Sequence, residues 1–311
     1  MANRPKMVLG LAIFFIALFI LFSKIFPGSV SPVSTFQITA SKNQFDISFN
    51  LTKSDQPQFQ KALEALQLPS SLQQGASFEL DSTSSAKLAY VSPIKGQFNF
   101  SPKTVHFSGN TNRTAVVRNL SFQSFVLPQN LNFAISGTDL AKTAQNYLNL
   151  PKNLVDAIIK DSSPGPQVVA SFGPEPGIVY IFKTGNFDIT SLKDLAGDSE
   201  YKQEMQDKIT FYILKNITAF EIGDFSFIAS NPDTAKAVVA ASKNKNHINF
   251  PTEKEGVVSL LYINTDKNPV PESLLVKMFN TEKKIPTFLK YISQINLTLK
   301  DKSFSGSIET R

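Results

Sequence analysis

The feature that most constrains this chain is a hydrophobic run near its start, residues 7–26 (MVLGLAIFFIALFILFSKIF), in which Lys24 carries the only charge. At about 1.5 Å of rise per residue, a helix of this length covers roughly 30 Å, the thickness of the hydrocarbon core of a bilayer. No second run of this kind follows in the sequence. We therefore expect one membrane-spanning helix that carries one large water-exposed part.

The charges around this run predict its orientation. Arg4 and Lys6 precede it, and an excess of basic residues marks the cytoplasmic side of a membrane helix. We therefore expect residues 27–311 to lie outside the cytoplasm and the lipid bilayer to be contacted through residues 7–26. A cleaved signal peptide is the alternative, but its apolar part is usually about 7 to 15 residues long and ends at an Ala-x-Ala site, which is missing here. Retention as a signal-anchor is favoured.

The chain contains no cysteine. This excludes disulfides, zinc–thiolate sites, cysteine nucleophiles and a lipid-modified N-terminal cysteine. An extracytoplasmic part without disulfides has to be stabilised by an ordinary hydrophobic core, and a chain of 311 residues is long enough to form one.

Charge and aromatic content exclude one function class and suggest another. Of the 31 Lys and Arg residues, three precede residue 27, which leaves 28 basic against 25 acidic residues, a net charge of +3. These charges are interspersed, whereas nucleic-acid binding requires a concentrated basic stripe, so we exclude that function. The 27 phenylalanines often alternate, as at Phe98 and Phe100. This spacing is typical of the core face of a strand, although a groove for an apolar ligand is an alternative.

Periodicity and turn chemistry predict an α+β fold with antiparallel sheets, helices packed on one face and two subdomains. A Pro-, Gly- and Ser-rich linker at 27–34 precedes a β-rich subdomain with one helix at 35–128, and an α+β subdomain follows at 129–311. Repeated strand–Thr-Asp–helix patterns in the second subdomain indicate duplicated units, but they also fit the general preference of Thr and Asp for helix starts.

The sequence predicts three local elements, which are two helices and a hairpin. Phe59, Ala62, Leu63 and Leu66 share one face of a helix that Ser54 or Asp55 can cap. The stretch 191–208 (SLKDLAGDSEYKQEMQDK) is predicted to be helical with a weak point at Gly197, and the chain is predicted to end in a β-hairpin that turns at Asp301-Lys302.

One stretch carries a family resemblance. In ITAFEIGDFSFIASNPDTAKAVVAAS, two strands are followed by a helix that begins after Asn231-Pro232-Asp233. This arrangement resembles uncharacterised bacterial extracytoplasmic proteins that have one N-terminal membrane helix followed by repeated α+β units. The resemblance covers residues 129–311 through loose motifs, and the family has no established activity to transfer.

A serine acyl-transferase signature is the strongest catalytic candidate. Ser84–Lys87 fits S-x-x-K, Ser108–Asn110 fits S-x-N and Lys183–Gly185 fits K-T-G, in the expected order. Ser84 would then be the nucleophile and Lys87 its base. Two observations oppose this: the residues around Ser84 predict a strand and a turn instead of a buried helix, and the motifs lie too close together for the intervening helical domain of such enzymes. We expect a chance match.

Other catalytic or metal-binding groups are scattered. His106 lies in a predicted strand and His247 in a predicted polar loop, and neither has a His, Asp or Glu neighbour at ligand spacing. Glu175, Asp188 and Asp194 form no recognisable motif, and the sequence contains neither a calcium loop nor a phosphate-binding glycine loop. We therefore predict no catalytic, cofactor-binding or metal-binding residue.

The sequence supports a functional hypothesis with two alternatives. The main hypothesis is a membrane-anchored extracytoplasmic protein that acts without catalysis, by binding an envelope partner or occupying a structural position. The first alternative is a carrier or chaperone for a lipid or another apolar ligand, which would require a cavity lined by phenylalanine. The second alternative is an envelope serine hydrolase that uses Ser84.

Overall fold

The computed structural model describes residues 34–40, 44–66, 68, 70, 73, 75–79, 94–101, 103–111, 125–138, 140–173, 177–196, 201–214, 217–243, 247–250, 257–266, 269–270, 274, 291–300 and 302–311. Within these residues, no helix is both long and apolar enough to span a bilayer. The predicted anchor at residues 7–26 lies outside them.

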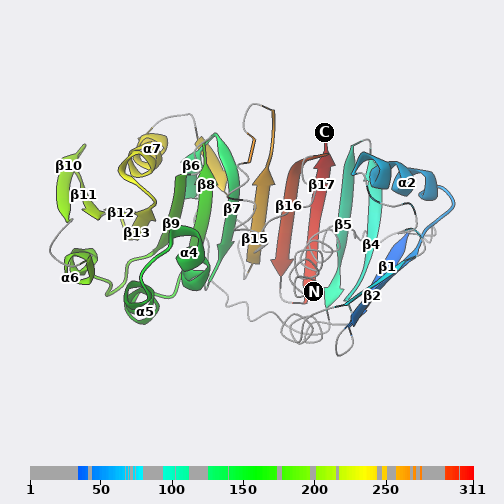
Figure 1. Cartoon of the computed structure of the whole chain (residues 1–311), viewed down its shortest axis with the longest axis horizontal. Coiled ribbons are helices and arrows are strands. Elements are labelled where there is room, and N and C mark those ends of the chain that lie inside the picture. Colours follow the sequence, from blue (N-terminus) through cyan, green and yellow to red (C-terminus); the bar gives the residue numbers. More distant parts are fainter. Residues whose placement is uncertain are drawn as a thin grey trace, which may run out of the picture. The chain divides into compact units, whose positions relative to one another are not determined.

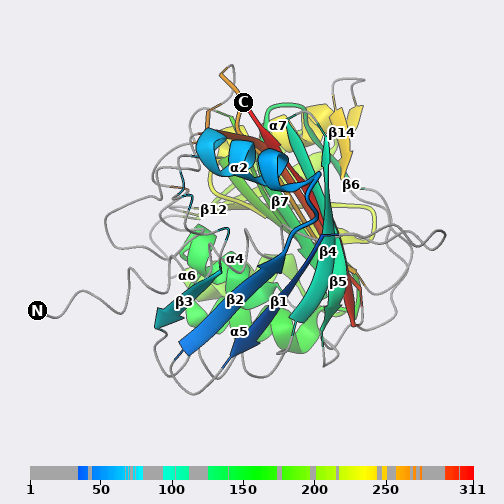
Figure 2. The same ribbon diagram turned by 90° about the vertical axis from the view of Figure 1, so that its right-hand side faces the viewer.

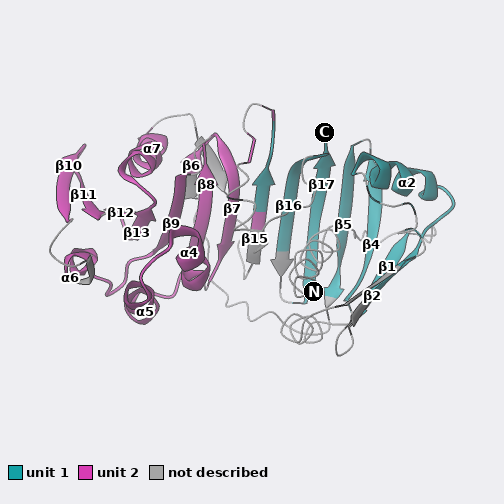
Figure 3. Cartoon of the chain, in the orientation of Figure 1, with its two compact units in different colours: residues 1–117, 261–265, 272–311 teal, residues 118–260, 266–271 magenta. Residues whose placement is uncertain are grey.

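The described chain forms two compact units of antiparallel strands and helices, which confirms the predicted α+β class. Unit 1 comprises residues 1–117, 261–265 and 272–311, and unit 2 comprises residues 118–260 and 266–271 (Figure 3). The units are not contiguous in sequence, unlike the predicted subdomains 35–128 and 129–311. The physical reason is strand pairing, because the hairpin near residue 300 pairs with the strand at residues 104–111.

Unit 1 is built on an antiparallel sheet in the order β16-β17-β5-β4-β1-β2-β3, and the helix α2 also belongs to it (Figure 1). The predicted terminal hairpin is present as β16 and β17. The elements are β1 (Thr35–Ala40), β2 (Gln44–Asn50), α2 (Gln56–Ala65), β3 (Ala76–Glu79), β4 (Ile94–Ser101), β5 (Thr104–Thr111), β16 (Ile292–Lys300) and β17 (Ser303–Thr310).

The strands of unit 1 alternate between apolar and polar side chains, which gives the sheet two different faces. Phe98 on β4 lies opposite Phe107 on β5, and both side chains are fully buried. Successive side chains of a strand point to opposite faces, so the neighbours of these residues belong to the other face. That face, which we call the polar face, carries mainly hydroxyl and amide side chains, among them Gln97, Asn99 and Ser108.

Helix α2 covers part of the apolar face and lies close to β4 (Figure 2). Phe59 and Leu63 are buried as predicted, Leu66 is buried at the C-cap just after the helix, and Ala62 is half-buried. The Phe59 ring packs against Phe98 at a centroid distance of 5.9 Å, and against Phe49 on β2 at 5.0 Å. The α2 side of the sheet therefore contains a packed aromatic core.

Two glycines allow close packing of rings on this apolar face. A methyl group on Gly109 would meet the Lys95 carbonyl oxygen and would lie 2.7 Å from Cζ of Phe304, the residue opposite it on β17. Likewise, a methyl group on Gly306 would collide with the ring of Phe107 opposite it. Each ring thus covers the glycine on the neighbouring strand, so both positions require a residue without a side chain.

Unit 2 contains a second antiparallel arrangement in the order β10-β11-β12-β13-β9-β8-β7, together with the pair β14-β6. Its strands are β6 (Phe125–Pro128), β7 (Leu131–Gly137), β8 (Gln167–Phe172), β9 (Gly177–Lys183), β10 (Lys202–Gln206), β11 (Ile209–Leu214), β12 (Ile217–Ile222), β13 (Phe225–Ala229) and β14 (His247–Phe250). Its helices are α4 (Ala141–Leu148), α5 (Lys152–Asp161), the 3-10 turn η2 (Ile189–Ser191), α6 (Leu192–Ala196) and α7 (Pro232–Lys243). Strand β15 (Val257–Ile263) contributes residues to both units.

The helices of unit 2 lie on both faces of its sheet, so the predicted one-sided packing is wrong for this unit. Tyr147 of α4 packs on Phe133 of β7 at a ring distance of 5.1 Å. Thr234 of α7 lies on the side of the sheet toward which a side chain on Gly177 of β9 would point, and such a side chain would collide with it. Strand pairing places Phe133 and Gly177 on opposite faces. This two-sided cover explains why every residue of β8 is buried.

The prediction of one helix over residues 191–208 is also wrong. The helix α6 ends at Ala196, and residues 202–206 form the strand β10. A two-residue turn at Asp207 and Lys208, both with positive φ, joins β10 to β11 in the pattern of a type I′ hairpin turn. Pairing with β11 therefore overrides the helix propensity of this charged segment.

Candidate functional site

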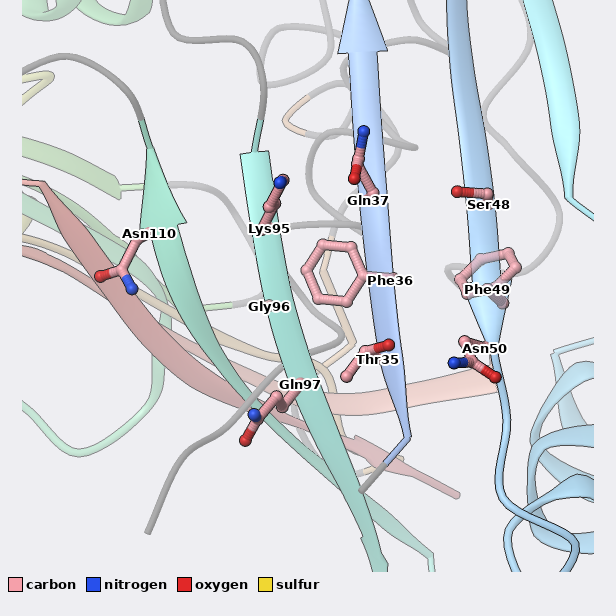
Figure 4. A pocket seen from close by; sticks show the side chains of 10 residues that line it. All are labelled: Thr35, Phe36, Gln37, Ser48, Phe49, Asn50, Lys95, Gly96, Gln97 and Asn110. Carbon is pink, nitrogen blue, oxygen red and sulfur yellow. The ribbon is translucent and has the colours of Figure 1, made fainter. Parts of the chain in front are cut away.

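A shallow depression of about 450 Å³ lies over β4, β1 and β2 of unit 1 (Figure 4). Its lining combines seven polar residues with two phenylalanines and one glycine. These residues are Thr35, Phe36, Gln37, Ser48, Phe49, Asn50, Lys95, Gly96, Gln97 and Asn110.

Strand register arranges the lining in three rows that run across the strands, as Figure 4 shows. In the middle row, Phe36 lies opposite both Phe49 and Gly96. The two outer rows are polar. One contains Ser48, Gln37, Lys95 and Asn110, and the other contains Asn50, Thr35 and Gln97.

The middle row presents its backbone to the depression, because its side chains belong to the α2 side of the sheet. Phe36 is only 4% exposed and stacks on Phe98, and Phe49 packs against Phe59 of α2. By strand alternation, the two outer rows belong to the polar face. The depression is therefore a strip of backbone between two rows of polar side chains.

The chemistry of the outer rows is dominated by groups that both donate and accept hydrogen bonds. Ser48 and Thr35 supply hydroxyls, while Gln37, Gln97 and the two asparagines supply amides. Lys95, which is exposed, is the single charged residue in the lining. The ten lining residues include no histidine or carboxylate, so this lining has no general acid or base of the usual kind.

A second, smaller depression of about 220 Å³ lies over β5, β16 and β17. It shares Asn110 with the first depression, and Ser108, Ser305 and Thr298 contribute further hydroxyls. The uncharged polar character thus continues from the first depression across the strands of unit 1.

The acyl-transferase signature does not form a site among the described residues. Ser84 and Lys87 lie outside them. Ser108 belongs to β5 of unit 1, where the adjacent Gly109 packs under a phenylalanine ring, whereas the K-T-G motif belongs to unit 2.

The K-T-G motif has a structural role at the end of β9. Thr184 shares a hydrogen bond of 2.9 Å with the buried hydroxyl of Ser226, and its N–H donates to the carbonyl of Asp224. Gly185 has a φ of +63° and lies against Ser163, where a side chain would collide. These contacts explain the sequence of the motif without catalysis.

The remaining candidates are dispersed. His106 is exposed on β5, and His247 lies in β14 opposite Pro128, so its backbone is a strand and not the predicted loop. Asp188 caps η2, and hydrogen bonds from the hydroxyl and N–H of Thr190 lower the pKa of its carboxyl below the usual value. Asp194 is exposed in α6. The described residues contain no group of three His, Cys, Asp or Glu side chains placed to hold a metal ion, and Glu175 lies outside them.

Many of the described phenylalanines pack against other aromatic rings. In unit 1, Phe98 contacts the rings of Phe36, Phe49, Phe59 and Phe100. In unit 2, the Phe220 and Phe227 rings stack at 4.8 Å. Both described depressions have polar linings, so neither provides the phenylalanine-lined cavity that the carrier alternative requires.

Sequence reasoning missed the polar rows of the depression. The available signal was the alternation itself, because the phenylalanines at 36, 49 and 98 are each flanked by Thr, Gln, Ser or Asn. Alternation alone predicts that these flanking side chains point away from the core. It does not predict that they lie next to one another on the sheet. Their grouping depends on pairing between β2, β1 and β4, which joins residues 60 positions apart in the sequence.

Comparison with known proteins gives little further information. No family model matches the chain, and no curated protein matches it. Among solved structures, crystal form I of TP0453 is similar over 55% of this chain and 69% of that chain, with 12% identity and a TM-score of 0.36. Crystal form IV of TP0453 is similar over 56% of this chain and 75% of that chain, with 11% identity and a TM-score of 0.36. Similarity at this level supports no inference about function.

Proposed function

We propose that this chain is a non-catalytic binding module of the cell envelope, anchored by residues 7–26 and exposed outside the cytoplasm from residue 27 onward. The observation that carries this proposal is the depression on the polar face of unit 1, which offers many hydrogen-bonding groups but neither a carboxylate nor a histidine. Such a lining is suited to holding a polar partner without transforming it.

The first described residues of the chain support a position of this depression close to the membrane. Ser34 is fully buried, its hydroxyl donates to the Asp55 carboxylate at 2.6 Å, and it accepts from the Thr52 N–H at 2.9 Å. Thr35, the next residue, lines the depression. Residues 27–33 can span at most about 25 Å when fully extended. With the proposed anchor, the start of β1 at the edge of the depression therefore stays within roughly that distance of the outer membrane surface.

The proposed topology can be tested by cysteine labelling, because the natural chain has no cysteine to react. Asn99→Cys places a thiol at an exposed position of β4, and Ala2→Cys places one before the anchor. In intact cells, a membrane-impermeant maleimide should label the Asn99→Cys variant but should label the Ala2→Cys variant only after lysis. Labelling of neither variant, or of Ala2→Cys alone, in intact cells would contradict the proposal.

The proposed binding face can be tested by photocrosslinking in intact envelopes. A benzoylphenylalanine at Gln97 reports on the depression, and one at Glu64, exposed on α2, is the matched control. We expect a discrete adduct from position 97 that position 64 does not give. The same adducts at both positions, or none at position 97, would refute binding through this face.

A further inference from the structure

We propose that the depression over β4, β1 and β2 binds a neutral carbohydrate chain. This inference rests on the proposed binding function and assigns its ligand class. It is drawn from the spacing of the outer rows, from their side chains, which are uncharged apart from Lys95, and from the absence of carboxylates in the lining.

The two outer rows have dimensions that suit an extended chain of sugar rings. Neighbouring strands of a sheet lie about 4.8 Å apart, and residues two positions apart on one strand are separated by about 6.7 Å. A strip of backbone about 6.7 Å wide thus runs across β2, β1 and β4, with polar side chains on both sides. A linear ligand that lies along the strip, across the strands, can form hydrogen bonds with both rows.

The side chains match the hydrogen-bonding character of sugars. Each sugar hydroxyl both donates and accepts, as do the hydroxyls of Thr35 and Ser48 and the amides of Gln37 and Gln97. Gln37 and Gln97 are half-buried, so part of each side chain is already ordered against the sheet. Such groups can bind a neutral polyhydroxylated ligand without the cost of burying an uncompensated charge.

The same lining disfavours the other classes of macromolecule. Protein interfaces are enriched in Tyr, Trp, Phe, Met and Arg, and their centres are apolar, whereas none of the side chains in the outer rows is aromatic or aliphatic. Nucleic acids and anionic polymers require several cations, and Lys95 is the only one in the lining.

The lining also indicates that such a carbohydrate is held intact. Glycoside hydrolysis requires two carboxyl groups on either side of the scissile bond, and the ten lining residues include none. The nearest carboxylate along β2 on the same face is Asp46, two residues before Ser48 and outside the lining. The proposed activity is therefore binding alone.

The test uses the full-length protein, kept in a detergent whose headgroup is not a sugar. The probes are hexasaccharides of β-linked glucose, β-linked N-acetylglucosamine and α-linked mannose, which are neutral, and of galacturonate, which carries carboxylates. Binding is measured by titration calorimetry for the wild type and three variants. The variants are Gln37→Ala/Gln97→Ala, which removes one amide from each row, Lys95→Gln, which removes the charge, and Asn99→Ala, an exposed control on β4 outside the lining.

We expect at least one neutral hexasaccharide to bind. One lost hydrogen bond weakens affinity about 2- to 13-fold, so the double variant should bind about tenfold or more weakly. Lys95→Gln keeps a hydrogen-bonding side chain in the row and should weaken binding of neutral hexasaccharides less than the double variant does, whereas Asn99→Ala, outside the lining, should change the affinity less than about twofold. Hydrogen exchange of the strands should be the same in all four proteins, which shows that the variants are folded.

Two results would overturn the inference. One is the absence of binding to every neutral hexasaccharide, and the other is binding of galacturonate alone that Lys95→Gln abolishes. Neither would by itself refute the proposed binding function, because crosslinking at position 97 decides that separately. A discrete protein adduct there would assign the depression to a protein partner, whereas no adduct would remove both proposals.

Discussion

Replacing Ser34 by alanine tests how the first described residue of unit 1 is fixed to the rest of the unit. The Ser34 hydroxyl is fully buried and connects two groups that are close in the loop before α2, the Asp55 carboxylate and the Thr52 N–H. The Ser34 carbonyl also accepts a hydrogen bond of 3.3 Å from the N–H of Phe98. The side chain thus fixes the start of β1 against the start of α2, while the backbone joins it to β4.

The expected loss follows from the two hydroxyl bonds. A hydrogen bond to a charged group contributes about 1.5 to 3 kcal/mol, and leaving a buried N–H without a partner costs about 1 to 3 kcal/mol. Asp55 is half-buried and regains part of its hydration, so we expect a net destabilisation of about 2 to 3 kcal/mol. This corresponds to amide exchange through local opening that is roughly 30- to 150-fold faster.

Hydrogen exchange monitored by mass spectrometry can measure this effect in the full-length protein. The amides of β1, β2 and β4 should exchange faster in Ser34→Ala, while those of β12 and β13 in unit 2 serve as an internal reference. Ser54→Ala is the matched control, because its hydroxyl is exposed and bonds only to the Thr52 side chain among the contacts described, so its effect should stay within about 0.5 kcal/mol. Unchanged exchange in Ser34→Ala, or an equal effect in Ser54→Ala, would refute this account.

Three further predictions concern stability. Gly109→Ala places a methyl 2.7 Å from Cζ of Phe304 and should destabilise unit 1 by about 1 to 3 kcal/mol in urea unfolding; an unchanged midpoint would contradict the packing. Lys208→Gly relieves a positive φ in the β10–β11 turn and should stabilise unit 2 by roughly 0.5 to 1 kcal/mol, whereas a lower melting temperature would argue against this turn. Burial raises the pKa of Tyr147, so the phenol ionises first in the unfolded chain, and the free energy of unfolding should fall as pH rises above about 10. Tyr147→Phe should make this fall with pH less steep. An equally steep fall in the variant would contradict the burial of this phenol.

The sequence determined the features that depend on residues close together in the chain. The spacing of Phe59, Leu63 and Leu66 defines one face of a helix whatever lies opposite it, so the position of α2 could be predicted. Alternation in β4 likewise predicted a strand with one apolar face. Composition alone excluded several types of site, because the chain has no cysteine and only two isolated histidines.

Tertiary structure decided the features that depend on pairing between distant strands. Residues 202–206 form β10 because β11 provides a hydrogen-bonding partner, although their composition also suits a helix. The C-terminal strand β17 joins unit 1 because β5 pairs with it. The candidate site has the same origin. Gln37, Ser48 and Lys95 are ordinary outward-facing strand residues in the sequence, and only the antiparallel register of β2, β1 and β4 brings them into one row, because cross-strand neighbours are set by register and not by position along the chain.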